Sequence, residues 1–168
     1  MRATKAAIGL LLLLMLGLHG ASSAAAVPVP VRSAQAALAF SSTMEDRVIT
    51  LTNRKRAAHG CGPLRLNRDL RQAARRHTKL MAEARAMDHQ LPGEPTLGTR
   101  VTRAGYTGWV RLAENLARGQ ATPADVVRAW MASPGHRRNI LDCGLRHIGV
   151  GYVKYGSTSW WTQDFGRR

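Results

Sequence analysis

The chain has 168 residues, which is room for one ordinary domain, and its formal net charge is +15. Hydrophobic residues make up 45% of the sequence, enough for a packed core, which excludes a wholly disordered protein. A composition this basic suggests either a nucleic-acid-binding protein or a secreted protein that works near anionic cell surfaces. The amino-terminal residues help to decide between these two classes.

The first 26 residues have the three-part layout of a secretory signal peptide. Arg2 and Lys5 precede an uncharged, leucine-rich stretch over residues 6–18 that is too short to span a bilayer comfortably. Small residues follow and end in the A-x-A cleavage signal of residues 24–26. We therefore expect a secreted, extracellular protein with no transmembrane anchor after cleavage. Because exported proteins seldom meet genomic DNA, we expect no nucleic-acid partner.

A spacer of Ala, Ser, Val and Pro over residues 27–42 follows, and we expect it to be disordered. One folded domain is expected over residues 43–168. Ser42 and Glu45 have the spacing of a capping box, which predicts a first helix over residues 43–59.

Asn67 is a good N-cap for a second, amphipathic helix that extends to about Ala86. His77 lies at the centre of its apolar side, which favours a core histidine over a ligand. The opposite side carries a basic stripe: Arg68, Arg71, Arg75 and Lys79. Such a stripe is typical of a solvated face, or of a surface that adheres to anionic polymers.

Short helices and a hairpin are expected in the rest of the chain. Residues 99–104 suit a short helix, Thr122 and Pro123 suit the start of another, and Ser133-Pro134 restarts a helix that reaches Leu141. Two strands flank the turn Gly156-Ser157. Helices first and a terminal hairpin predict an α+β layered domain.

The two cysteines, Cys61 and Cys143, are expected to pair, because an even pair in an oxidising setting usually forms a disulfide. Closing so long a loop would stabilise the fold by ~4 kcal/mol on the chain-entropy estimate. Two free buried thiols are the alternative. A metal site at the cysteines is disfavoured, because neither has a ligand at metal-binding spacing.

Several motifs occur in one order along residues 43–166. They are Gly60-Cys61-Gly62-Pro63-Leu64, Ala113-Glu114-Asn115-Leu116-Ala117, the Trp130–Leu141 segment with its Ser-Pro-Gly-His run, Ile148-Gly149-Val150-Gly151-Tyr152 and Trp160-Trp161-Thr162-Gln163-Asp164-Phe165-Gly166. At these separations the sequence resembles the CAP superfamily of cysteine-rich secretory, antigen 5 and pathogenesis-related proteins, especially its small exported bacterial members. The resemblance implies a three-layer α-β-α sandwich of the CAP (SCP) type.

The resemblance also implies a cleft lined by two histidines and two acids. His89 and His136 match the two histidines, and Glu114 matches the acid of the Glu-Asn motif. The position of the second acid holds Ser133. Two imidazoles and one carboxylate suit zinc or another divalent metal, with an open position for water. The alternative for His89 and Glu114 is a buried, hydrogen-bonded pair that holds loops together, and His136 could simply point into the cleft.

Three functions remain open from the sequence. The first is a monomeric binding protein whose cleft takes a metal or a small apolar ligand, such as a lipid or sterol, at the cell envelope. The second is a hydrolase, either metal-dependent or with Ser133, His136 and Glu114 as a catalytic relay. The third is adhesion through the basic stripe. Binding is preferred, because the family implies no universal enzymatic activity and Ser133 before a proline is typical of a helix cap.

Overall fold

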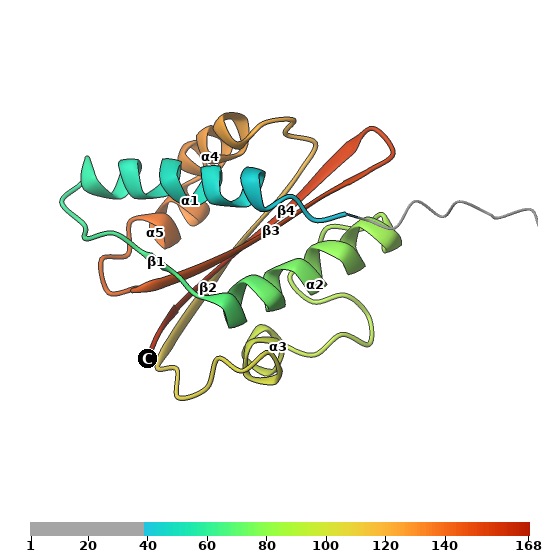
Figure 1. Cartoon of the computed structure of the whole chain (residues 1–168), viewed down its shortest axis with the longest axis horizontal. Helices are drawn as coiled ribbons and strands as arrows, with labels where there is room; N and C mark the ends of the chain where they lie inside the picture. Colours follow the sequence, from blue (N-terminus) through green and yellow to red (C-terminus); the bar gives the residue numbers. More distant parts are fainter. Residues whose placement is uncertain (1–38) are drawn as a thin grey trace, which may run out of the picture. The chain divides into compact units, whose positions relative to one another are not determined.

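The computed structural model describes residues 39–168, so the expected signal peptide and most of the expected spacer lie outside the described residues. Two layers of helices enclose one four-stranded sheet (Figure 1). The strand order is β1-β3-β4-β2, and only the β1–β3 pair is parallel. Helices α1, α4 and α5 pack on one face of the sheet, and α2 and α3 pack on the other. This is the α+β sandwich that the sequence predicts.

The elements in chain order are α1 (Ser42–Ala57), β1 (Arg65–Leu66), α2 (Arg68–Ala84), α3 (Leu97–Arg103), β2 (Arg111–Arg118), α4 (Pro123–Ala132), α5 (Pro134–Ile140), β3 (His147–Tyr155) and β4 (Thr158–Arg167). Each expected helix is present, with ends shifted by a few residues. The terminal hairpin is β3 and β4, and its turn is Gly156-Ser157 as predicted. Strand β2 was not predicted.

The expected caps Asn67 and Thr122 are confirmed. The Asn67 side chain accepts a hydrogen bond from the Leu70 backbone N–H at 2.9 Å, and Thr122 accepts one from Asp125 at 3.2 Å. The expected capping box of α1 is wrong, because the N-cap is Ser41. Glu45 is instead fully buried. The folded part thus includes residues that were expected to belong to the spacer.

Helix α2 lies directly against the backbone of β3, because the strand presents glycines to it. A Cβ atom at Gly149 would lie 2.1 Å from the Arg71 backbone nitrogen, and one at Gly151 would lie 2.6 Å from the carbonyl carbon of Ala74. The alternate side chains of β3, such as Ile148 and Val150, enter the larger core beneath α1 and α4. Strand β3 therefore presents large apolar side chains to one layer of helices and, at its two glycines, close backbone contact to α2.

The disulfide between Cys61 and Cys143 is present, as predicted. It lies beside Arg56, which is fully buried at the end of α1. The Arg56 guanidinium donates to the carbonyl groups of Gly62, Ile140 and Asp142 at 2.8–2.9 Å. Since these carbonyls belong to two distant segments, Arg56 and the disulfide together hold the end of α1 to the α5–β3 connection.

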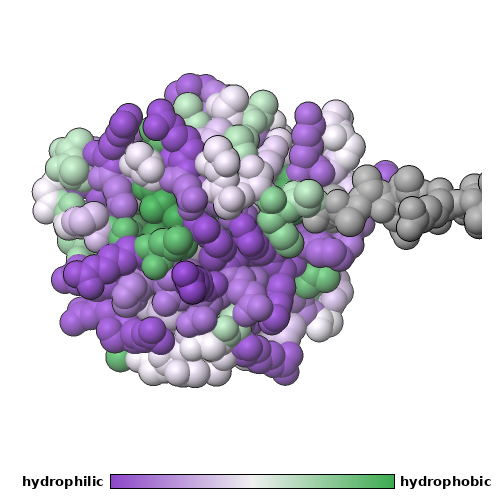
Figure 2. All heavy atoms as spheres, in the orientation of Figure 1, coloured by the Kyte–Doolittle hydropathy of each residue, from purple (hydrophilic) through white to green (hydrophobic). Residues whose placement is uncertain are grey.

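The expected basic stripe of α2 is only partly a solvated face. The side chains of Arg71 and Arg75 are 14% and 29% exposed, and both form ion pairs with buried Glu45 of α1. Lys79 is paired with Glu83 on its own helix. In Figure 2 hydrophilic residues cover most of the visible face and surround a small apolar area. Two of the four stripe residues thus join α1 to α2.

Among residues 39–168, no helix is long and apolar enough to cross a membrane.

The close approach of α2 to β3 predicts that Gly149→Ala destabilises the fold. The added methyl group would overlap the α2 backbone, and forcing such a shift costs about 1–3 kcal/mol or more. Urea unfolding followed by circular dichroism measures this loss. Gly62→Ala is the matched control, because a Cβ there meets no atom within 4 Å. Equal stability of the two variants would contradict the close packing.

Candidate functional site

The centre of the candidate site is Glu114 on the edge strand β2. Its side chain faces the α2–α3 layer and is only 3% exposed. Asp164 is its partner across the β2–β4 ladder, so two carboxyl groups lie side by side beneath the helices. Asn115, the next residue, faces the opposite layer and bonds to Gln163 at 3.0 Å. The alternation of β2 therefore buries an acid on one face and an amide on the other.

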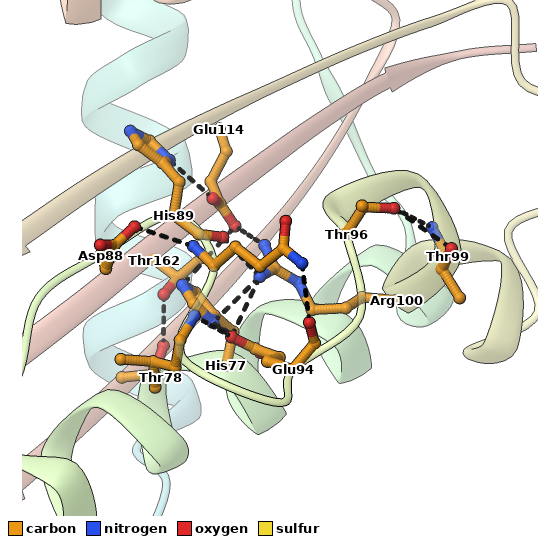
Figure 3. A network of polar contacts seen from close by, with 12 residues as sticks. His77, Thr78, Asp88, His89, Glu94, Thr96, Thr99, Arg100, Glu114 and Thr162 are labelled. Carbon is orange, nitrogen blue, oxygen red and sulfur yellow. Dashed lines mark hydrogen bonds and ion pairs between the residues drawn. The ribbon is translucent and has the colours of Figure 1, made fainter.

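Arg100 of α3 and His89 of the α2–α3 connection hold the Glu114 carboxylate (Figure 3). Arg100 Nη2 donates to Glu114 Oε2, and Arg100 Nη1 donates to the His89 carbonyl at 2.7 Å. His89 Nδ1 lies 2.8 Å from Glu114 Oε1, which requires that the imidazole donates from this nitrogen. The His89 side chain is 62% exposed, so a buried carboxylate orients an accessible imidazole.

A second pair supports Arg100 from the helix side. His77 of α2 is fully buried, and its Nδ1 lies 2.8 and 2.9 Å from the two carboxylate oxygens of Glu94. Glu94 also lies 3.3 Å from Arg100 Nη1. His77 is thus the hydrogen-bonded core histidine that the sequence predicts. Its Nε2 is 4.0 Å from Glu114 Oε2, which places it in the same charged network.

The two neighbouring carboxyl groups hold their protons differently. Burial raises the pKa of Asp164 well above its ordinary value, and the charge of Glu114 raises it further. Neither oxygen of Asp164 has a hydrogen-bond partner in the described part of the chain. Burial also acts to raise the pKa of Glu114, but the hydrogen bond from His89 and the charge of Arg100 outweigh it, and the pKa is lowered. Glu114 is therefore the ionised member and Asp164 the protonated one.

The two site histidines are also shifted in opposite directions. The hydrogen bond to Glu114 raises the pKa of His89 above its ordinary 6.5, against the opposing effect of burial. Burial lowers the pKa of His136, and the charge of His89 lowers it further. Near neutral pH, His89 therefore binds a proton more readily than an ordinary histidine, and His136 binds one less readily.

His136 reaches the site from α5, on the other side of β2. The Asn115 amide donates to the His136 carbonyl at 3.2 Å, and the Asn139 amide donates to the Glu114 carbonyl at 3.1 Å. The predicted residues are therefore gathered around β2, although only His89 contacts the Glu114 carboxylate directly. Ser133 is the N-cap of α5 but makes no capping hydrogen bond with its side chain. No hydrogen bond among residues 39–168 links Ser133 to a histidine, so the Ser-His-Glu relay is not assembled.

The sequence did not indicate Arg100, Glu94 or Asp164 as members of the site. Arg100 and Glu94 carry no motif, and only the fold brings them beneath His89. Asp164 had one available signal. In a strand of the hairpin it shares a face with buried Trp160 and Thr162, so alternation alone implies a buried carboxyl group.

Zinc fits this donor set poorly. Both oxygens of Glu114 are engaged, one by His89 and one by Arg100, and a guanidinium at the carboxylate repels a divalent cation. Within residues 39–168, no three His, Cys, Asp or Glu side chains meet at metal-binding distances. The zinc site stays a prediction. The chemistry that the arrangement supports directly is donation of a hydrogen bond or a proton from the His89 imidazole.

Comparisons with known proteins agree with this fold. A family model described as "Cysteine-rich secretory protein family" (CAP) matches residues 49–165. The chain therefore belongs to the CAP family, as the resemblance implied.

Two curated relatives come from Bacillus subtilis (strain 168). "Uncharacterized protein YkwD" is 40% identical over 147 residues, which are 86% of this chain and 55% of that protein. "Uncharacterized membrane protein YlbC" is 28% identical over 126 residues, which are 75% of this chain and 35% of that protein. The chain thus spans about half the length of the first relative and a third of the second.

Solved structures share the sandwich. An extracellular SCP-domain protein from Bacillus anthracis is 28% identical with a TM-score of 0.69, covering 75% of this chain and 41% of that one. An outer surface protein from Borrelia burgdorferi is 22% identical with a TM-score of 0.70, covering 78% of this chain and 98% of that one. The second likeness concerns the fold alone.

Arg100→Gln is predicted to destabilise the protein strongly. Removing the guanidinium leaves the buried carboxylate of Glu114 without its cation, which costs about 3–5 kcal/mol. Chemical unfolding at pH 7 measures the change. Arg103→Gln, an exposed arginine on the same helix, is expected to stay within about ±0.5 kcal/mol. A loss of less than about 1 kcal/mol in Arg100→Gln would show that Glu114 does not depend on this pair.

Proposed function

We propose that this protein works outside the cell as a binding module, and that its ligand binds at the edge of β2 against His89 and His136. The expected signal peptide supports the location, and so does the likeness to an extracellular SCP-domain protein. The observation that carries the proposal is the accessible His89 imidazole, fixed by a carboxylate that is itself buried. A preorganised donor of this kind recognises a ligand with little further ordering.

The ligand class follows from the groups that the site leaves free. Arg100 and His89 already engage the Glu114 carboxylate, so the accessible polar groups are the His136 imidazole and the second nitrogen of His89, which donates when that ring is protonated. They suit a polar envelope ligand that offers an acceptor or a negative charge. One 160 Å³ pocket adjoins the network and is lined by residues that include Leu80, Pro95 and Arg100. None of His89, Glu114 and His136 lines this pocket, so it is separate from the proposed ligand position.

Hydrolysis is a second candidate, favoured by the opposite pKa shifts of the two histidines. Pairs of groups whose pKa values are pushed apart supply an acid and a base at one pH. His89 would then be the acid and His136 the base. A nucleophilic Ser133 has no support from its hydrogen bonds, so the attacking group in this version is water. Binding without turnover remains the preferred function.

The double variant His89→Ala/His136→Ala tests the proposal. We expect the purified protein to co-sediment with isolated cell envelopes of the producing organism, and the variant to bind at least about tenfold more weakly, the value of one charge-assisted hydrogen bond. Because protonated His89 is the donor, binding should weaken as the pH rises through its elevated pKa.

His59→Ala is the matched control, since His59 is exposed and bonds only to its own helix. The proposal would be contradicted if the double variant bound envelopes as tightly as wild type at every pH. The two histidines would then have a structural role. Zinc-dependent binding would favour the metal prediction instead. Release of soluble products by wild type, lost in the double variant, would favour hydrolysis.

A further inference from the structure

A separate pocket of about 680 Å³ lies at one end of the sheet, where β1 and β3 begin and β4 ends. Its lining residues are Gly62, Pro63, Arg65, Cys143, Arg146, His147 and Arg168. None of the candidate site residues His89, Glu114 and His136 lines it. The pocket is therefore not part of the site at the edge of β2.

The charge of this pocket has one sign. Three arginines, Arg65, Arg146 and Arg168, line it, and its lining holds no acidic side chain. None of the three forms an ion pair within residues 39–168. Asp142, in the turn beside the disulfide, is already engaged by Arg111 at 2.9 Å. Three guanidinium groups thus share a concave surface, and none of them is paired with an acidic side chain.

The backbone holds these arginines together. The Arg65 N–H donates to the Arg146 carbonyl at 2.9 Å, and the Arg146 N–H donates to the Gly166 carbonyl at 3.1 Å. The disulfide of Cys143 fixes the wall beside them. The Arg168 guanidinium lies over the Tyr106 ring, 5.0 Å from its centroid. The ladder thus fixes the backbones of Arg65 and Arg146 side by side, whereas the side chains of all three arginines are exposed and can adjust to a ligand.

His147 reports the positive potential inside the pocket. Its Nδ1 lies 2.9 Å from the Tyr106 hydroxyl. Burial lowers the pKa of His147, and the charges of Arg168 and Arg65 lower it further. An anion in the pocket would oppose those two charges and raise the pKa again.

We propose that this pocket binds a phosphate-bearing ligand. Guanidinium groups pair with phosphate through two parallel hydrogen bonds, and several of them suit a group that carries more than one charge. The volume exceeds that of a single phosphate ion, so the pocket suits a phosphate ester. This site does not depend on the function proposed for His89 and His136.

Titration with glycerol phosphate, followed by NMR at the His147 imidazole, tests the proposal. We expect saturable binding to the full mature chain and an increase in the His147 pKa on saturation. The triple variant Arg65→Gln/Arg146→Gln/Arg168→Gln should lose at least about tenfold in affinity, the value of one charged hydrogen bond, because it removes every guanidinium group that lines the pocket. Arg168→Gln alone should lose a smaller part, and it keeps the test valid if the triple variant folds poorly.

Arg47→Gln/Arg54→Gln/Lys55→Gln is the matched control, because it removes three exposed charges from α1. His89→Ala/His136→Ala should bind glycerol phosphate like wild type, which separates this test from that of the proposed function. Vesicles of phosphatidylglycerol and phosphatidylcholine in equal amounts form a second arm, and binding with the same variant dependence would identify a lipid headgroup as the source. Equal losses in the triple variant and its control, or an unchanged His147 pKa, would overturn the proposal.

Discussion

Two carboxyl groups buried side by side are the constraint around which the α2–α3 layer is arranged. Glu114 and Asp164 are partners on the neighbouring strands β2 and β4. Two adjacent carboxyl groups that are buried from water cannot both stay ionised. Arg100 neutralises one of them, and a retained proton neutralises the other. The positions of α3 and of the α2–α3 connection follow, because both must deliver groups to Glu114.

The exposed part of the site depends on the same constraint. His89 is accessible, yet its orientation and its raised pKa come from a carboxylate that water does not reach. An accessible imidazole held by a buried network keeps its geometry when a ligand arrives, as a binding site requires. A metal would have to displace Arg100 or His89 from Glu114, which explains why the expected ligand set does not assemble as three ligands.

Much of the fold can be predicted from local signals in the sequence, whereas the site can be predicted only in part. Asn67 and Thr122 are caps whose bonds depend on neighbouring residues, so they could be recognised locally. Strand β2 could not be recognised locally, because Ala113, Glu114 and Asn115 have low strand propensity and gain their conformation from pairing with β4. The role of Arg100 arises only when α3 docks over that strand. Family motifs identified His89, Glu114 and His136, but not the charges that hold them.

The central claim is that Glu114 is ionised and Asp164 protonated at neutral pH. The most direct test is a pH titration of their side-chain carboxyl carbons by NMR. The account predicts that Glu114 titrates below its ordinary 4.5, whereas Asp164 keeps its proton far above its ordinary 3.8. Titration of both carboxyl groups near those ordinary values would contradict the account, because it would mean that the network of Arg100 and His89 does not divide the charge between them.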